Sequence, residues 1–263
     1  MPEFMGTDRS IALQRRLRDR QPEIDRSQHL VNGARIMHFL DPEKTGWGKV
    51  RELAEEDGLV GFPVVSPDDT ICMIKDQLGA RWETSVFDAL LGDAARVLSA
   101  CATVIDAVGL PAGWRASMHD CPDERQITEV QALNAETGVS PYPAYYMRSE
   151  FLPVLTACIR DDQGKLVATA SVADRYHRDS RLGGHVFAGM VSVSDENRGR
   201  GLGKLINALA LVESQRRFGW RVATEHVAVD NAVSRSMILA CGLDQARGLT
   251  SITATAPEEG FTR

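Results

Sequence analysis

The amino-acid sequence predicts a mixed α/β protein whose C-terminal part, from about residue 113, is built on one mixed sheet. Three observations lead to this prediction. A nearly continuous apolar segment over 186–193 is typical of a buried central strand. A glycine-rich turn follows it, and after the turn a helical pattern runs to Gly219. Strand-like and helix-like segments then alternate around this unit up to residue 256.

Composition limits the classes of protein to which the chain can belong. Of its 263 residues, 43% are hydrophobic and 25% are charged, which is ordinary for one large or two average globular domains. No apolar segment approaches the length of a membrane span, and the N-terminus does not resemble a secretion signal, so we expect no membrane partner. The net charge of −6 argues against a nucleic-acid partner. Five scattered cysteines without a C-x-x-C pair indicate no metal site and a cytoplasmic protein.

The N-terminal residues 1–30 carry six arginines interleaved with acidic side chains. This mixture of charges predicts a solvated segment, either a frayed helix or a disordered one. It is a poor candidate for an arm that binds nucleic acid.

Residues 31–112 are expected to form an accessory region that is mostly helical. Short helices are predicted around Val50 and from Ser85 to Leu91, and a longer one begins after Asp93 and ends at Gly109. The region contains no phosphate loop, metal cluster or catalytic triad that we recognise. Its long apolar stripe, from Ala95 to Val108, must be buried nearby. We therefore expect the region to pack on the C-terminal part and to form one wall of the acceptor site, without contributing a strand to the sheet. We find no convincing internal repeat, but the alternative that this region is a degenerate tandem copy of the C-terminal fold stays open.

Residues 113–263 show a regular order of elements. The predicted order is a strand, a helix, a proline-rich loop with three tyrosines, a hairpin, the central strand, a helix, a strand, a helix and a last strand. Their expected bounds are 114–119, 122–138, 140–146, 154–173, 186–193, 202–219, 221–229, 231–241 and 249–255.

The turn after the central strand has the chemistry of an anion site. Glycines allow backbone N–H groups to approach a phosphate, and the first turn of a helix presents unpaired amides and a positive dipole end. Three basic side chains add positive charge. The spacing fits neither a P-loop nor a dinucleotide-binding motif. The candidate anion-binding residues are Arg198, Gly199, Arg200, Gly201, Gly203 and Lys204.

Two motifs in this part resemble the GNAT superfamily of acyl-CoA-dependent N-acyltransferases. Arg198, Gly201 and Gly203 match its pyrophosphate motif Q/R-x-x-G-x-G/A. About thirty residues later, a strand, an asparagine, a small residue and a Gly-Leu pair match its second motif. The matching residues are Asn231, Ser234, Met237, Gly242 and Leu243, with Ile238 where the family usually has a tyrosine. The resemblance covers about residues 113–256 and implies a GNAT-like fold.

The resemblance also implies roles for particular residues. Acetyl-CoA would be held by the turn, with Asn231 and Ser234 beside its pantetheine arm. A main-chain N–H between Val191 and Val193, at a bulge in the central strand, would polarise the thioester carbonyl.

The general base is harder to assign. The positions that the family often uses hold Phe187 and Gly189, which cannot accept a proton. His185 on the central strand and Glu225 on the next strand are therefore the candidate catalytic residues. His226 lies beside Glu225 and faces the opposite way.

The expected activity is transfer of an acetyl group to a primary amine of a small molecule or amino acid by direct attack. The implied co-substrate is acetyl-CoA, with no metal. The missing tyrosine and the apolar base positions motivate an alternative, a catalytically weak acyl-CoA sensor or interaction protein with the same fold. Whether the chain forms a homodimer stays open.

Overall fold

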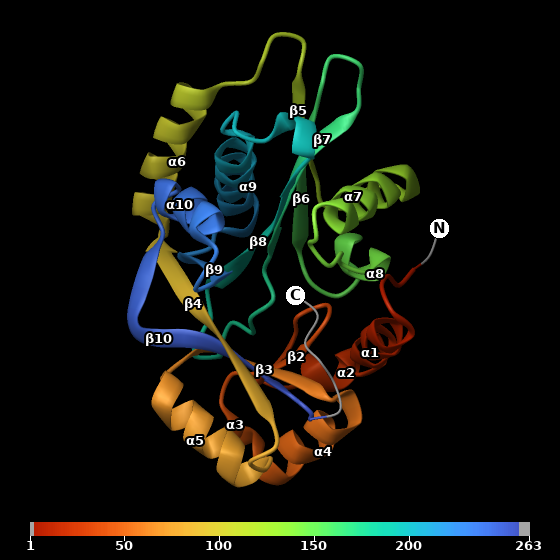
Figure 1. Cartoon of the computed structure of the whole chain (residues 1–263), viewed down its shortest axis with the longest axis vertical. Helices are drawn as coiled ribbons and strands as arrows, with labels where there is room; N and C mark the ends of the chain where they lie inside the picture. Colours follow the sequence, from red (N-terminus) through yellow and green to blue (C-terminus); the bar gives the residue numbers. More distant parts are fainter. Residues whose placement is uncertain (1–2, 258–263) are drawn as a thin grey trace.

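The structure is a computed structural model, which describes residues 3–257. Ten strands form one continuous sheet in the order β1-β2-β3-β10-β4-β9-β8-β7-β6-β5 (Figure 1). This mixed sheet with helices on both faces confirms the predicted α/β class. No helix among residues 3–257 is long and apolar enough to cross a membrane. The strands are β1 Leu30–Asn32, β2 Met37–Phe39, β3 Leu59–Val65, β4 Glu83–Asp93, β5 Arg115–His119, β6 Val154–Arg160, β7 Leu166–Ala173, β8 His185–Val193, β9 Val222–Ala228 and β10 Asp244–Thr255.

The helices cover the two faces of the sheet unequally. Helices α6, α9 and α10 pack on one face, where Val186 and Ala188 of β8 meet the apolar side of α9. Helices α7 and α8 pack on the other face of β6 to β8. The helices are α1 Asp8–Asp19, α2 Gln21–Ile24, α3 Pro42–Thr45, α4 Trp47–Asp57, α5 Pro67–Gln77, α6 Ala94–Val108, α7 Glu124–Glu136, α8 Ala144–Met147, α9 Leu202–Phe218 and α10 Ala232–Ala240, with a 3₁₀ turn at Asp195–Asn197.

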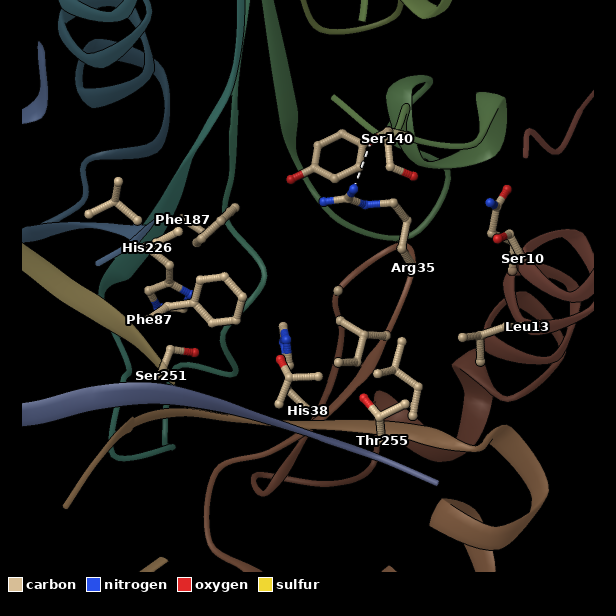
Figure 2. Close-up of a pocket in the computed structure, with 18 of the residues that line it drawn as sticks. Ser10, Leu13, Arg35, His38, Phe87, Ser140, Phe187, His226, Ser251 and Thr255 are labelled. Carbon is tan, nitrogen blue, oxygen red and sulfur yellow. Dashed lines mark hydrogen bonds between the residues drawn. The ribbon is translucent and has the colours of Figure 1, made fainter. Parts of the chain in front are cut away.

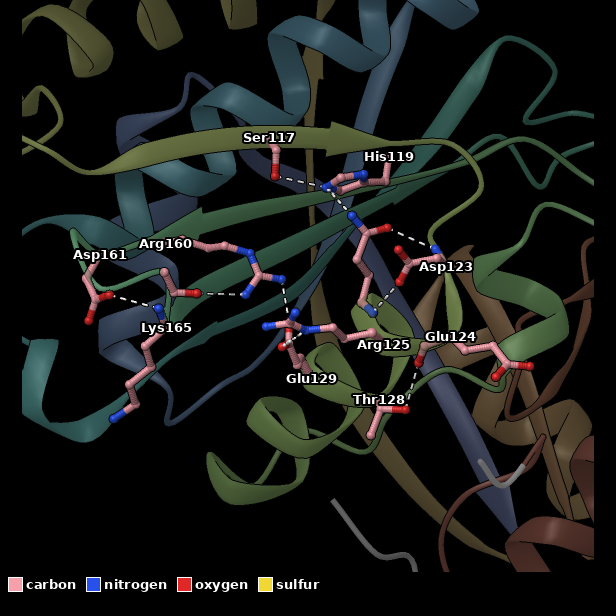
Figure 3. Close-up of polar contacts among 12 residues, drawn as sticks. Ser117, His119, Asp123, Glu124, Arg125, Thr128, Glu129, Arg160, Asp161 and Lys165 are labelled. Carbon is pink, nitrogen blue, oxygen red and sulfur yellow. Dashed lines mark hydrogen bonds and ion pairs between the residues drawn. The ribbon is translucent and has the colours of Figure 1, made fainter.

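Most C-terminal elements lie where the sequence predicts them, but β10 begins at Asp244, before the predicted 249, and the predicted loop 140–146 contains the start of α8. Helix α7 begins with a capping box: the Asp123 carboxylate accepts from the main-chain amide of Gln126, and the Gln126 side-chain oxygen accepts from the amide of Asp123 (Figure 3). Arg160 of β6 forms an ion pair with Glu129 of the same helix, which ties α7 to the sheet. Helix α9 ends at Gly219, whose φ of 65° is the left-handed conformation of a C-terminal cap.

The first 112 residues differ from the expectation. The segment from Ser85 to Leu91 belongs to strand β4, because it pairs with β9 on one side and with β10 on the other. Helices α3 to α6 make up the larger part of the regular secondary structure of residues 31–112. The first 112 residues also contribute four strands and complete the sheet, so they are not dispensable for it. The N-terminal segment is also ordered over α1, because Leu13 and Leu17 are buried in the core under β3.

The strand order reveals a repeat that the sequence left open. In the first half (residues 30–93) an antiparallel hairpin leads to parallel β2 and β3, then to α5 and β4. In the second half (residues 166–255) hairpin β7–β8 leads to parallel β8 and β9, then to α10 and β10. The order β1-β2-β3-β10-β4-β9-β8-β7 is unchanged when the halves are interchanged, because each half gives its last strand to the other. The chain is thus a degenerate tandem repeat with exchanged strands.

The repeat extends to the turn after the first parallel strand. Gly46-Trp47-Gly48-Lys49 begins α4 as Gly201-Leu202-Gly203-Lys204 begins α9, and both first glycines have positive φ. A short helical turn precedes each. In both turns an acidic residue pairs with a basic one three positions on, Asp41 with Lys44 at 3.3 Å and Asp195 with Arg198 at 2.9 Å.

Candidate active site

The turn between β8 and α9 keeps the features of an anion site. Gly201 occupies the N-cap position of α9 with a φ of 78°, and it has no side chain that could accept hydrogen bonds from the amides of the first helical turn. A Cβ on Gly201 would also come within 3.2 Å of Val108, at the end of α6. Arg200 stacks over Trp114, with its guanidinium carbon 4.9 Å from the ring centroid. Arg198 is exposed, and Lys204 lines a groove beside α6.

Strands β8 and β9 separate next to this turn. Their pairing covers only the first three residues of β8 and ends with Phe187 opposite Thr224. On its other side β8 has a bulge: Gly189 pairs with Ser171 and Ser192 with Thr169, so Met190 and Val191 together oppose one residue of β7. Met190 has a φ of 56°, which is rare for a residue with a side chain. A bulge leaves a main-chain group outside the ladder. The resemblance implied the bulge between Val191 and Val193, whereas it lies at Met190 and Val191, because Ser192 and Val193 pair with β7.

The bulge also changes which side chains face α9. Before it, Val186 and Ala188 lie on the α9 side of the sheet. After it, Val191 and Val193 do, and they lie near the position where Gly203 would carry a Cβ, at 4.0 and 3.8 Å. Gly203 therefore lets the start of α9 lie close to β8, on the strand that carries the bulge.

A cavity of about 750 Å³ lies on the opposite face of the sheet, between the two halves. Phe187 of β8 and His226 of β9 form one wall, and Arg35 and His38 of the first half form another (Figure 2). Tyr142, from the loop before α8, and residues of α1 and β10 complete the lining. The guanidinium of Arg35 donates to the carbonyl of Ser140 at 2.8 Å and lies 3.7 Å from the sulfur of Met190. Arg35 therefore connects the cavity to the residue that forms the bulge, and the first half forms one wall of the cavity.

The two candidate bases do not line this cavity. His185 lies at the start of β8, where its Nδ1 is 3.3 Å from the hydroxyl of Thr224. Glu225 points to the other face, where Asn207 of α9 donates to its carboxylate at 2.8 Å. Burial raises the pKa of Glu225 to about 7, against the opposing effect of that hydrogen bond. Both side chains are held within the structure, away from the cavity as the described residues define it.

His226 is the histidine that the sequence argument passed over. Its ring centroid lies 5.2 Å from that of Phe187, two residues before Gly189, and both side chains line the cavity. Burial, and then the positive charge of Arg175, lowers the pKa of His226 to about 3, so the ring is neutral near pH 7. Its Nε2 has no hydrogen-bond partner. The sequence held a signal for this choice: Glu225 alternates with apolar Ala223 and Val227, which marks its side as the core side.

Three further predicted positions can now be placed. Asn231 caps α10 by accepting a hydrogen bond from the Ser234 amide at 3.0 Å, and both residues line the cavity. Ile238 is buried among apolar side chains between α9 and α10. No phenol stands there to protonate a leaving group. Of the three loop tyrosines, Tyr142 lines the cavity.

The equivalent space in the first half is filled. Strands β2 and β3 pair through Met37 and His38 and then separate. Arg181, from the loop between β7 and β8, bridges the opening: its guanidinium donates to the carbonyls of Leu40 at 2.6 Å and Val64 at 2.8 Å, and to that of Pro63. The first half therefore has the turn and the parallel strands, but no open gap between them.

Known structures share this fold. The structure is similar to a tandem GNAT protein from the clavulanic acid biosynthesis pathway, with 18% identity, coverage of 88% of this chain and 77% of that one, and a TM-score of 0.57. A GCN5-related N-acetyltransferase from Kribbella flavida matches with 17% identity, coverage of 94% and 96%, and a TM-score of 0.58. A GCN5-related N-acetyltransferase-like protein from Streptococcus suis matches with 14% identity, coverage of 86% and 82%, and a TM-score of 0.56.

Neither a protein-family model nor a curated protein matches the sequence. The chain nevertheless has the fold of the GNAT superfamily, which confirms the fold that the resemblance implied.

Proposed function

We propose that the protein is an acetyl-CoA-dependent N-acetyltransferase that acts on a primary amine of a small molecule. The observation that carries this proposal is the position of the bulge in β8. On the α9 face, the bulged strand runs to the glycine turn; on the other face, Arg35, which lines the cavity, lies 3.7 Å from the sulfur of Met190 in the bulge. A donor held at the turn and an acceptor held in the cavity would meet at this one point of the sheet.

The turn fits acetyl-CoA on three counts. Its N-cap glycine leaves the amides of the first helical turn without a side-chain cap, and Gly203 allows the start of α9 to lie close to β8. The positive charges of Arg198 and Lys204 can balance the negative charge of a pyrophosphate. Acetyl-CoA supplies the thioester: the amine nitrogen bonds to the acetyl carbon, the C–S bond breaks, the thiolate leaves and the nitrogen loses a proton.

The chain's own groups have two tasks. A main-chain N–H at the Met190–Val191 bulge, being outside the strand ladder, can donate to the oxygen on which negative charge develops. The neutral imidazole of His226 has an unpartnered Nε2 that can accept the proton of the amine, directly or through one water.

One observation favours the alternative, a protein that binds acyl-CoA without turnover. Ile238 is apolar and buried, so the thiolate would have to take its proton from solvent or substrate. The same assay separates the two functions, because a sensor would bind acetyl-CoA and release no thiol with any amine.

The test measures thiol release from acetyl-CoA across a panel of small amines, in the wild type, His226→Gln and the matched control His185→Gln. We expect His226→Gln to lower kcat about a hundredfold, since a positioned base typically contributes this much, with acetyl-CoA binding retained. His185→Gln should keep most of the activity, because that ring lies outside the cavity. Equal activity of the wild type and His226→Gln would contradict the assignment of the base. Absence of thiol release from the wild type, with acetyl-CoA bound, would contradict catalysis.

A further inference from the structure

The cavity between the halves concentrates polar groups that have no partner. Ten buried side-chain nitrogen or oxygen atoms among the described residues lack a hydrogen bond, and five of them belong to residues that line this cavity. Buried polar atoms are nearly always satisfied in folded proteins, so such a cluster indicates that a ligand completes them. The five atoms are Arg35 Nε, His38 Nδ1, Arg175 Nε, His226 Nε2 and Thr255 Oγ1.

The two arginines are the informative members of this group. Arg175 is 7% exposed, and its guanidinium carbon lies 3.8 Å from the centroid of the Phe187 ring. Arg35 lies over the ring of Tyr142 at 5.7 Å. None of the ion pairs formed among residues 3–257 involves either arginine. Arg175 also donates to the hydroxyl of Tyr176 at 3.2 Å, and Arg35, which is half-buried, donates to the carbonyl of Ser140. An arginine stays charged at any working pH, and these neutral partners offset the desolvation of the two guanidinium groups only in part.

The other titratable groups of the cavity do not balance this charge. Burial, followed by the charges of Arg175 and then of His226 and Arg35, holds the pKa of His38 well below its usual range, and His226 is neutral as well. Tyr142 keeps its proton, because burial raises its pKa. The carboxylate of Asp230 also lines the cavity, but on an exposed residue after the end of β9. The inner part of the cavity is therefore positively charged.

We propose that the acceptor carries an anionic group, a carboxylate, which binds between Arg35 and Arg175. This inference rests on the proposed function, because it names the class of amine that the same cavity takes. The main chain of Met190 lies in the bulge, and its side-chain sulfur contacts Arg35. The proposed carboxylate site and the proposed site of acyl transfer are therefore separated only by the side chain of Met190. The acceptor is then a compact amino acid, with its amine and its carboxylate separated by a few bonds.

This assignment gives a function to the two arginines, which form no ion pair among the described residues and whose Nε atoms lack a hydrogen-bond partner. A guanidinium binds a carboxylate through two parallel hydrogen bonds, which orients as well as attracts it. A bound carboxylate would also offset the charge of Arg175, one of the two causes of the low pKa of His226. The acceptor would therefore raise the basicity of the imidazole that accepts its proton.

The test measures binding without acetyl-CoA, so it is independent of turnover. Thermal protection of the full chain is recorded with glycine, β-alanine, 4-aminobutyrate, acetate and butyrate, with the amide of each acid, and with 2-aminoethyl phosphate. We expect protection by the carboxylates and none by the amides. In Arg35→Met and Arg175→Met the affinity should fall at least tenfold, whereas the exposed control Arg125→Met should behave as the wild type.

Three outcomes overturn the proposal: no carboxylate protects the wild type, acids and amides protect equally, or Arg35→Met keeps full protection. Stronger protection by the phosphate than by any carboxylate would assign the site to phosphorylated amines and overturn the carboxylate assignment. If Arg175→Met does not fold, the partly exposed Arg35 still decides the question, with Arg35→Lys expected to retain part of the binding. If thiol release is as fast with neutral amines as with amino acids, the proposed acetyltransferase activity is supported and only the carboxylate site is contradicted.

Discussion

The two halves of the sheet share one plan and differ in what fills the gap between their parallel strands. In the second half, β8 and β9 separate after Phe187 and Thr224, beside a bulge and a cavity. In the first half, the side chain of Arg181 occupies the same place and uses three main-chain carbonyls as acceptors. The comparison shows that the topology of each half creates a gap between two parallel strands, whereas the side chains determine whether that gap is open or filled.

The glycine turns that begin α4 and α9 also differ in whether their lysine forms ion pairs. Lys49 of the first half is engaged in ion pairs with Glu23 at 3.4 Å and Glu52 at 3.3 Å. Lys204 of the second half lies in a groove beside α6, without an ion pair among the described residues. The first-half lysine therefore contributes to the surface of the fold, and the second-half lysine is free to meet a phosphate.

The largest effect should follow from separating the halves. A chain that starts at Gly113 lacks β4, so the edges of β9 and β10 that pair with it would be exposed. Unpaired edges and uncovered apolar surface promote aggregation. We expect this fragment to be insoluble alone and to become soluble when residues 1–112 are co-expressed with it. A soluble, folded fragment with an unchanged sheet, judged by circular dichroism and light scattering, would contradict the exchanged-strand repeat.

Opening the filled gap of the first half should come next. Arg181→Met removes three hydrogen bonds from one charged group and leaves buried carbonyls without a donor, so we expect the free energy of unfolding to fall by about 3 kcal/mol. The matched control is Arg178→Met, from the same loop and 90% exposed, which should change stability little. Denaturant unfolding measures both. An unchanged stability of Arg181→Met would show that Arg181 is not a structural plug.

A third difference between the halves is the pH dependence of stability. Glu225 of β9 is buried, whereas its counterpart strand β3 contains no ionisable side chain. The folded pKa of Glu225, about 7, lies above its ordinary value of 4.5, so its stabilisation is full below about 4.5 and is lost as the pH rises through about 7. Glu225→Gln should therefore flatten the stability profile over this window and gain up to about 3 kcal/mol at pH 8. Parallel profiles for wild type and variant would contradict this account.

The sequence alone was sufficient where local patterns decide the structure. The capping residues of α6 and α7, the β6–β7 hairpin and the glycines of the α9 turn carry their own signals, and the fold class followed from them. Strand β4 could not be found in this way, because Ser85 to Leu91 is a short apolar segment whose pairing on both sides is set by strands distant in the sequence.

The site was partly predictable for the same reason. The turn and the bulge follow from motifs, whereas the cavity depends on Arg35 and His38, which come from a half that showed no motif of its own. Strand β2 is only three residues long, so the Gly46-x-Gly48-Lys49 turn after it did not stand out as a copy of the second turn. The alternation along β9, with Glu225 between apolar Ala223 and Val227, places His226 and not Glu225 on the cavity side.

The central claim is that one half binds the acyl donor and the other does not. Calorimetric titration with acetyl-CoA tests it with matched double variants of the two turns, Arg198→Gln/Lys204→Gln in the second half and Lys44→Gln/Lys49→Gln in the first. We expect one site per chain, binding weakened roughly a hundredfold by the second-half variant because two charged contacts are lost, and no change in the first-half variant. Two sites per chain, or equal losses in the two variants, would contradict the claim.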